Sequence, residues 1–451
     1  MRKASLIYCV AAVALMSTAA LLLPYSSSAA MPAPVVQTVG LRPTFSRDIA
    51  PILYKNCAGC HRTGEIAPMS LLTYEEARPW ARSIREQVAN GMMPPWHAVA
   101  PRGTFSNDRR LSDEERDILI RWVDAGAPKG DPRDLPSAPK FTDGWQIGKP
   151  DVVLSMPSEY EVPASGTVPY QYFQVPTNFN EDKWVRAVEV RPGTRSVVHH
   201  ILVFCQEPGP PRPPGFVQII PKMPAYGIAH GHGDAHAAGH ARGPGALLGT
   251  TAPGTNAMIF EPGTAMLVKK GATLLFQIHY TANGVVTRDR SSVGLIFANQ
   301  PPELEIRNSA FVNAMFVIPA GARDQSVESA IQFEQDSHIW ALFPHTHLRG
   351  KSWEYRLVYP DGRSETVLSV PKYDFNWQTY YVFARPLAVP KGTRLEATAH
   401  YDNSAGNRWN PDPSIEVRWG EQTWQEMQYS GITLTIDNQR RENVGGGTAA
   451  R

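Results

Sequence analysis

Cysteine is scarce in this sequence. Only 4 of the 451 residues are cysteines, at positions 9, 57, 60 and 205. Cys9 lies in an apolar N-terminal run. Cys57 and Cys60 are close enough in sequence for both thiols to bond to the same group. Cys205 is then left without a partner, so we expect no disulfide framework to hold the protein together.

An excess of charge of one sign is also lacking. Lysines and arginines number 44, aspartates and glutamates number 42, and the formal net charge is +2. This balance gives no reason to expect nucleic acid or an anionic membrane surface as a partner. No repeat with the period of a solenoid is present either. A chain of 451 residues is instead expected to form two or three compact domains.

Long apolar runs are missing outside the N-terminus. Arg2 and Lys3 precede the apolar run 6–23, and small residues follow at 26–30. This order is typical of an export signal, so we predict that residues 1–30 are a signal peptide and that the protein is periplasmic or otherwise exported. The run is also long enough to act as an N-terminal membrane anchor if it is not cleaved.

The first part of the mature chain has a helical pattern. Thr73 with Glu76, and Ser112 with Glu115, have the spacing of capping boxes that open helices. We therefore predict a small all-α domain at residues 31–135, with Pro79 kinking or shortening the first of these helices. The following residues, 136–150, are rich in proline and glycine and are predicted to be a linker.

The rest of the chain has a β pattern. Short β-branched and aromatic runs alternate with Gly, Pro and Asn turns, which predicts an all-β sandwich region. Strands are expected at residues 170–175, 184–190, 197–204, 272–280, 337–343, 352–359, 380–383 and 394–400. Pro301-Pro302 predicts a boundary between two tandem all-β domains, 151–303 and 304–437, and residues 438–451 are expected to be a disordered tail. The predicted fold class is therefore multidomain, with one small all-α and two all-β domains.

The run Cys57-Ala58-Gly59-Cys60-His61 is a CxxCH motif. In this motif the two thiols attach covalently to a haem, and the adjacent histidine binds its iron. A thioredoxin-type dithiol would need a βαβ pattern around it, and a zinc site would need a second pair of ligands. Neither is evident, so we predict one covalent haem c.

Residues 31–135 also resemble class I cytochrome c, from the helix before Cys57 to a closing helix with Trp122. In that family a methionine followed by proline supplies the distal iron ligand. Met93, which precedes Pro94, matches this pattern, and Met92 and Met69 are the alternatives. His97 is a further competitor but is expected on the surface.

Histidines form two notable pairs in the β region. His345 and His347 should share one face of a strand, because side chains alternate with period two, and His279 ends another strand on the same face as Gln277. His199 and His200 are adjacent, so both can reach one metal only where the strand twists or ends, or through different ring nitrogens. A single strand histidine is more often structural, but these pairs together favour a metal site.

The motifs around these histidines resemble those of the copper type II, ascorbate-dependent monooxygenases, the family of the peptidylglycine and dopamine hydroxylases. The resemblance covers about residues 150–435. It rests on the runs 197–202 around His199-His200, 276–280 around His279, 345–348 with His345 and His347, and 424–427 ending at Met427. A blue-copper site would instead need a cysteine ligand with neighbouring His and Met, which Cys205 lacks.

The resemblance implies a fold of two tandem jelly-roll-like β-sandwiches and a site with two coppers. One copper would transfer electrons and be bound by His199, His200 and His279. The other would activate O2 and be bound by His345, His347 and Met427, the expected catalytic residues. The thioether of Met427 suits Cu(I), although simple core packing is an alternative for this residue.

This chain departs from the animal enzymes of that family. They rely on disulfides, and the peptidylglycine enzymes carry an arginine two residues before the HxH pair. Here that position is Phe343, so an apolar or aromatic substrate is expected in place of a peptidyl-glycine.

Four further histidines, His230, His232, His236 and His240, lie in a Gly- and Ala-rich stretch. This stretch is expected to be a solvated loop, with copper capture as the alternative. His338 is expected to be structural, and His400 is expected to be either structural or a neighbour of the methionine-bound copper.

These features together predict an exported copper monooxygenase that hydroxylates an aliphatic or benzylic C–H bond, with electrons fed through the fused haem. Its partners would be a small-molecule substrate, O2, and an ascorbate-like reductant or a redox protein. The alternative is a non-catalytic redox or copper-carrier module. A third hypothesis is a structural β protein that binds no metal in its β domains.

Overall fold

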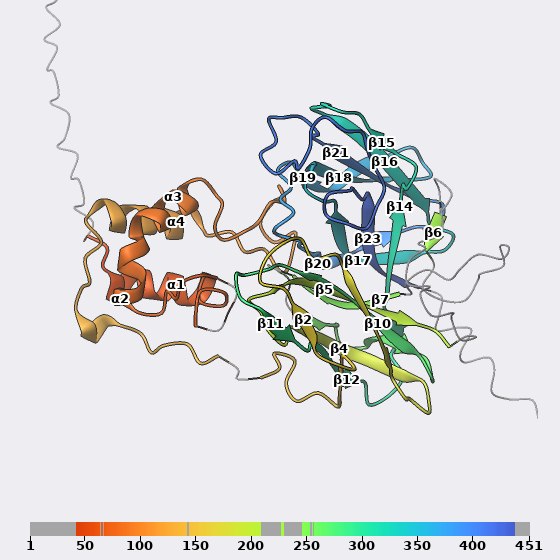
Figure 1. Ribbon diagram of the computed structural model, residues 1–451, viewed down its shortest axis with the longest axis horizontal. Helices are drawn as coiled ribbons and strands as arrows, with labels where there is room; N and C mark the ends of the chain where they lie inside the picture. The colour runs from red at the N-terminus through yellow and green to blue at the C-terminus, as the bar shows by residue number, and fades with distance from the viewer. Residues whose placement is uncertain are drawn as a thin grey trace, which may run out of the picture. The chain divides into compact units, whose positions relative to one another are not determined.

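The computed structural model describes residues 42–63, 65, 67–141, 144–208, 246–252, 255 and 257–437, and the backbone of 227–229. The expected signal peptide, His230, His232, His236 and His240, and the expected tail 438–451 lie outside the described residues. All described residues belong to one compact unit, which is mostly β-sheet with few helices (Figure 1). Within this described part, no helix is both long and apolar enough to cross a membrane.

The helices all lie before residue 135. They are the π-helix η1 (Phe45–Ile49), α1 (Ala50–Asn56), α2 (Tyr74–Ala77), the 3-10 helix η2 (Arg78–Trp80), α3 (Ala81–Ala89), α4 (Asp113–Asp124) and the 3-10 helix η3 (Pro132–Asp134). Both predicted capping boxes are present, because Thr73 and Ser112 each accept the amide of the glutamate three residues later. As predicted, Pro79 divides the first helical stretch into α2 and α3. Trp122 is fully buried in the core of these helices.

The first β unit consists of two sheets packed face to face. One sheet has the order β3 (Gln171–Pro176), β10 (Thr273–Tyr280), β5 (Val198–Gln206), β7 (Ala246–Thr251). The other has the order β1 (Val152–Ser155), β12 (Ser292–Phe297), β4 (Lys183–Arg191), β9 (Thr264–Val268), β13 (Leu304–Glu305), with β8 (Met258–Ile259) beside β4. A small pair joins β2 (Tyr160–Val162) and β11 (Thr287–Asp289). Alternate residues such as Val203 and Phe276 fill the core between the sheets.

The second β unit repeats this layering. Its first sheet has the order β20 (Tyr381–Val389), β17 (Ser337–His345), β23 (Tyr429–Ile436), β14 (Arg307–Val312), β6 (Gly227–Ala229). Its second sheet has the order β16 (Gln325–Gln332), β21 (Arg394–Tyr401), β18 (Gly350–Val358), β19 (Ser364–Val370), and β15 (Val317–Ile318) pairs with β22 (Val417–Arg418). The core between these sheets includes Leu342 and Trp353. All eight predicted strands are present, with ends that differ by a few residues.

The two β units pack together through one sheet each. Phe204, Leu247 and Leu275, from β5, β7 and β10, form an apolar cluster with Ala341 and Phe343 of β17. On β5 and β10 these residues alternate with those that fill the first core, so they lie on the outer face of the sheet. Histidines on the same outer faces are thereby brought to the contact between the units.

Two boundaries differ from the prediction. β13 pairs with β9, so the first β unit continues slightly beyond residue 303. More notably, residues 96–107 pack on the second β unit, although the sequence places them in the helical domain. Trp96 and Phe105 are buried in the second core, and the amide of Val99 donates to the carbonyl of Ser369 at 2.9 Å. A segment between α3 and α4 thus completes a β-sandwich.

Candidate metal centre

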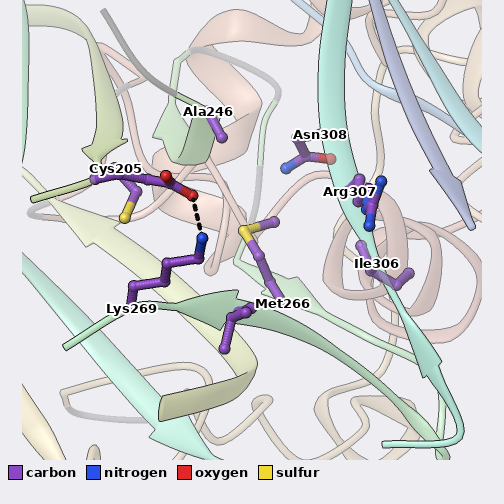
Figure 2. Close-up of a pocket in the computed structure, with 9 residues that line it drawn as sticks. Cys205, Ala246, Met266, Lys269, Ile306, Arg307 and Asn308 are labelled. Carbon is purple, nitrogen blue, oxygen red and sulfur yellow. Dashed lines mark ion pairs between the residues drawn. The ribbon is translucent and has the colours of Figure 1, made fainter. Parts of the chain in front are cut away.

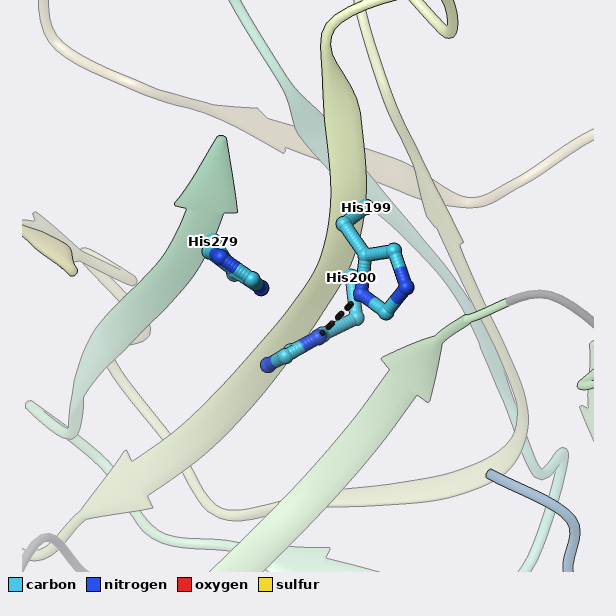
Figure 3. A group of neighbouring side chains, drawn as sticks. All are labelled: His199, His200 and His279. Atoms are coloured by element: carbon cyan, nitrogen blue, oxygen red, sulfur yellow. Dashed lines mark hydrogen bonds between the residues drawn. The ribbon is translucent and has the colours of Figure 1, made fainter. Parts of the chain in front are cut away.

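Two adjacent histidines of β5 reach the same side of their sheet because the strand pairing shifts there. His279 on β10 pairs with His200, but the next residue, Tyr280, pairs with Val198. His199 is therefore the extra residue of a β-bulge, which kinks the strand and turns a side chain that would otherwise point to the opposite face. Figure 3 shows the three imidazoles converging from the two neighbouring strands.

The geometry of this three-histidine group fits a single metal ion. One nitrogen from each of His199, His200 and His279 lies within 4.8 Å of the others. The Nδ1 atoms of His199 and His200 are 3.0 Å apart, and Nδ1 of His279 is buried with no hydrogen-bond partner among the described residues. Nitrogens this close can bind one ion at the imidazole bond length of about 2.0–2.1 Å known for zinc.

Burial keeps these imidazoles neutral. It lowers the pKa of His199 to about 4 and that of His279 to about 3, and it lowers the pKa of His200 well below its usual value. The neighbouring imidazoles act in the same direction on His200 and His279. Because the pKa values lie far below neutrality, each ring keeps a free lone pair at physiological pH, which is the form that binds a metal.

His345 and His347 form a second group. β17 ends at His345, and His347 lies just beyond the strand, so only the first was correctly placed on a strand. Their ring centroids are still only 5.2 Å apart. Nδ1 of His347 lies 3.1 Å from the carbonyl of Gln425, and its Nε2 is buried without a partner in the described chain. The contact to Gln425 orients the ring and leaves Nε2 available as a ligand atom.

Burial lowers the pKa of His345 to about 4 and that of His347 to about 3. Nδ1 of His345 is likewise a buried nitrogen with no partner among the residues described. Unpaired buried polar atoms are rare in native proteins, and three of those in the described chain belong to these two groups, on His279, His345 and His347, where each is available as a ligand atom.

Glu426 and Arg349 support the backbone of the second group through hydrogen bonds. The Glu426 carboxylate accepts the amide N–H of His347 at 2.7 Å and that of Arg349 at 2.6 Å. The Arg349 side chain is fully buried, and its Nε donates to Asn403 at 2.7 Å. Burial raises the pKa of Glu426 to about 8, although both amides and the guanidinium act in the opposite direction.

Met427 directly follows Glu426 in the chain, and the Glu426 carboxyl group accepts the amide of His347. The pairing of β17 with β23 ends at His345 and Tyr429, so Met427 lies just before β23 and outside the ladder. Met427 is buried, and its carbonyl accepts the hydroxyl of Tyr401 at 2.7 Å. These contacts do not bring the Met427 sulfur to either histidine, so its place as third member of the second group stays a prediction.

The two histidine groups are neighbours, separated by the ring of Phe375. This ring stacks on His199, with centroids 5.5 Å apart and planes inclined by 13°. It also lies edge-on to His347 at 5.9 Å. Tyr170 closes the first group from another side, with its ring 5.5 Å from His200 and 5.0 Å from His279.

The sequence analysis missed Phe375, Glu426, Arg349 and Tyr170. Glu426 and Arg349 adjoin predicted ligands, and an acid or a buried arginine next to a ligand is a signal that could have been used. Phe375 and Tyr170 carry no such signal, because they come from loops far away in sequence.

Cys57, Cys60 and His61 of the CxxCH motif are half-buried. Cys57 follows α1 directly, and the amides of Cys60 and His61 donate to its carbonyl at 3.0 and 2.9 Å. Burial raises the pKa of Cys57 to about 12 and lowers that of His61, whose Nδ1 has no partner in the part of the chain described. This compact turn, with two thiols and an unpaired imidazole nitrogen, is compatible with a haem attachment site.

The methionines proposed as distal ligand differ in exposure. Met69 packs against the helical core and Met93 is half-buried, whereas Met92 is 41% exposed. Met69 and Met93 are therefore the better placed of the three. His97 is half-buried, with its pKa lowered by burial, which corrects the expectation that it lies on the surface.

The remaining described histidines have ordinary partners. Nδ1 of His338 lies 2.7 Å from Asp437, and Nδ1 of His400 lies 3.0 Å from Asp324. Gln277, on the same face as His279, donates to the hydroxyl of Tyr172 at 3.0 Å. Nδ1 of His338 and Nδ1 of His400 thus each have an acidic partner.

A separate pocket, lined by residues of the first β unit and by Arg307 and Asn308 of β14, contains none of these histidines (Figure 2). It is lined by Cys205, Met266 and Ile306 among others, with an ion pair of 3.1 Å between Lys269 and Glu207 at its side. Burial raises the pKa of Cys205 to about 12, so this thiol is un-ionised at neutral pH.

Comparisons with known proteins do not assign the chain to a family. No family model matches it, and no curated protein matches it. Among solved structures, the major capsid protein P2 of bacteriophage PM2 aligns over 64% of this chain and 98% of its own, with 10% identity and a TM-score of 0.27. The structure of infectious bursal disease virus Gx strain aligns over 65% and 74%, with 9% identity and a TM-score of 0.19. Similarity this low carries no inference about function.

Proposed function

We propose that this chain is an exported copper-dependent monooxygenase that hydroxylates a substrate C–H bond with O2 and receives electrons through its own c-type haem. The observation that carries the proposal is the pair of buried, neutral histidine groups that meet at the contact of the two β units. Nδ1 of His279, Nδ1 of His345 and Nε2 of His347 are buried and have no hydrogen-bond partner among the described residues. Imidazole and thioether are also the ligands that suit copper.

The groups differ in the chemistry that their ligands favour. Three imidazoles suit copper in both oxidation states, so His199, His200 and His279 fit an electron-transfer site. His345, His347 and Met427 add a soft thioether, which favours Cu(I), the state that reacts with O2. Bound copper supplies the one-electron redox chemistry, while the protein orients the imidazoles through Gln425 and Glu426 and excludes water by burial.

The finer interpretation of the fold belongs to the same proposal. The helical region would be a class I cytochrome c domain, and the two β units would be jelly-roll-like sandwiches of the copper type II monooxygenase kind. Cys57 and Cys60 would hold the haem, with His61 and either Met93 or Met69 as iron ligands.

Support for an internal electron feed comes from the loop that follows the CxxCH motif. Glu65 in this loop lies 3.4 Å from Nε of Arg195, in the turn that leads directly into β5 and His199. A tethered donor also has a high effective concentration without needing a strong interface. The external partners would be a small-molecule substrate, O2, and an ascorbate-like reductant or a periplasmic redox protein.

An apolar substrate fits the surroundings of the site. Phe343 stands where the peptidylglycine enzymes carry a carboxylate-binding arginine. Its ring stacks on Tyr380 and on His345, with centroids 4.4 and 6.0 Å away. This aromatic wall offers no charge to anchor a substrate carboxylate, so an aliphatic or benzylic compound is the proposed substrate class.

The test is hydroxylation of a panel of benzylic and aliphatic compounds under ¹⁸O2, with the purified, copper-loaded protein. Wild type should incorporate label, and Met427→Leu should abolish product while keeping the copper of the three-histidine group. Cys60→Ala should slow turnover driven by a protein donor but leave the copper content intact. Full activity of Met427→Leu would remove this residue from the mechanism, and unchanged donor-driven turnover of Cys60→Ala would remove the haem.

A copper carrier or redox module is the second candidate, because the ring of Phe375 lies between the two groups and contacts His199 and His347. Substrate-coupled O2 uptake separates the two functions. A carrier binds copper but shows no such uptake with any compound of the panel.

A further inference from the structure

Phe375 has an unusual position for a buried phenylalanine. Its neighbours include four candidate ligand rings, because it stacks on His199 and also lies within ring-contact distance of His200, His345 and His347. It is only 8% exposed, yet it belongs to none of the apolar cores of the described residues. Its side chain therefore packs against the histidine groups and not inside a sandwich core.

The turn that carries Phe375 is largely self-contained. Asp374 accepts the amide of Asn376 at 2.9 Å and its side-chain nitrogen at 2.8 Å, and the amide of Trp377 donates to the Asp374 carbonyl at 2.9 Å. Asn376 at the tip is exposed. An Asx turn of this kind is stabilised within itself, so it can move as one piece.

The base of the turn, by contrast, is firmly attached. The hydroxyl of Tyr373 donates to the carbonyl of Thr346, between His345 and His347, at 2.9 Å. On the other side, Thr255 donates to the carbonyl of Gln378 at 2.6 Å. These two attachments flank residues 374–377 and mark the ends of a short segment that carries Phe375.

We propose that Phe375 is a gate that occupies the substrate position: its ring fills the place between the two histidine groups that an apolar, ring-sized substrate takes, and residues 374–377 swing outward to admit that substrate. That this position is a substrate position rests on the proposed function. Because an aromatic ring occupies the site in the closed form, a substrate that replaces it should be apolar and of similar size. The alternative is that the Phe375 ring is a fixed spacer that stays between the two histidine groups.

The first test uses copper-free protein and benzene as the probe. Phe375→Ala should open a ring-sized apolar cavity that binds benzene, with nuclear Overhauser contacts from benzene to the rings of His199 and His347. Phe375→Trp should show none. Phe316→Ala is the matched control, because Phe316 is also 8% exposed but stacks on Tyr401 inside the second core. Absence of benzene contacts to the histidines in Phe375→Ala would overturn the proposal.

The second test asks whether the wild-type ring moves. We place 4-fluorophenylalanine at position 375 and, as a control, at position 316, and follow the ¹⁹F signal during a benzene titration. The signal at 375 should shift toward a solvent-exposed value, and that at 316 should not. Wild type should bind benzene more weakly than Phe375→Ala by roughly tenfold or more, since a closed population of about 90% or more weakens apparent binding by that factor.

An unmoved ¹⁹F signal at 375, up to the solubility limit of benzene, would show a fixed spacer and contradict the gate. Neither test involves copper or turnover. If benzene displaces the Phe375 ring but the protein does not hydroxylate, the proposed function is rejected and the gate stands. If the ring does not move but the enzyme is active, the gate is rejected and the proposed function stands.

Discussion

At the scale of single residues, the second histidine group depends on a buried acid. Glu426 receives the amides of His347 and Arg349, so one carboxylate fixes the backbone on both sides of Leu348. Arg349 is enclosed behind it and donates to Asn403 and to the carbonyl of Trp424. This arrangement holds the ring of His347 in place before any metal arrives.

Glu426→Gln tests this support. An amide presents one acceptor and one donor, so one backbone N–H loses its partner, at a cost of about 1–3 kcal/mol in the free energy of unfolding. Copper affinity of the His345 and His347 group should fall roughly 10- to 100-fold, as for other losses of a ligand's supporting contacts. Competition with a copper chelator measures this. Glu416→Gln, which changes a surface ion pair with Arg418, is the control and should alter neither quantity. Equal effects of the two variants would contradict the role of Glu426.

The three cysteines after residue 30 provide a second residue-scale prediction. The pKa of Cys205 is raised by burial to about 12, so at pH 8 only about one such thiol in ten thousand is the reactive thiolate, and the native protein should resist alkylation. After denaturation, peptide mapping should find the label on Cys205 alone, because Cys57 and Cys60 would be thioethers to haem. Label on Cys57 and Cys60 would show that no haem is attached there.

The sequence was most informative at this scale. The HH and HxH motifs identified histidines that the structure brings close together in two groups, and the CxxCH motif forms a half-buried turn. Phe375 and Tyr170 could not be predicted, because their positions depend on how distant loops pack and no local pattern records that.

At the scale of elements, one irregularity builds the first histidine group. The bulge opposite His279 lets His199 and His200 point to the same site, whereas a regular strand would place one of them in the core. The adjacent histidines suggested that the strand must twist or end. The register shift itself was not predictable, because it depends on the pairing with β10.

The segment 96–107 gives a prediction at the same scale. Trp96 is 7% exposed and packs edge-on to Tyr381 at 5.1 Å, so Trp96→Ala should destabilise the second β unit by about 3–5 kcal/mol. Hydrogen exchange should then rise in β19 and β20 more than in α3 and α4. Trp80→Ala, at a position 41% exposed in η2, should change little. If exchange rose only in the helices, residues 96–107 would belong to the helical domain, as the sequence alone suggests.

At the scale of the whole molecule, the site exists because two sheets from different β units face each other. The order of elements and the division into helical and β parts were predictable from capping boxes and alternating strands. The contact through Phe204, Leu275 and Phe343 was not, because outward apolar residues on a strand do not reveal what covers them. This contact brings the ring of Phe375 within 6 Å of both His199 and His347, and so keeps the two histidine groups close but separate.

The central claim is that this contact holds two copper ions, and copper analysis of the purified protein tests it most directly. Wild type should bind two coppers and one haem per chain. His279→Ala and His347→Ala should each lose one copper, while His400→Ala, whose imidazole pairs with Asp324, should lose none. Wild-type protein that binds no copper after loading with Cu(I) or Cu(II), with its fold intact, would contradict the account.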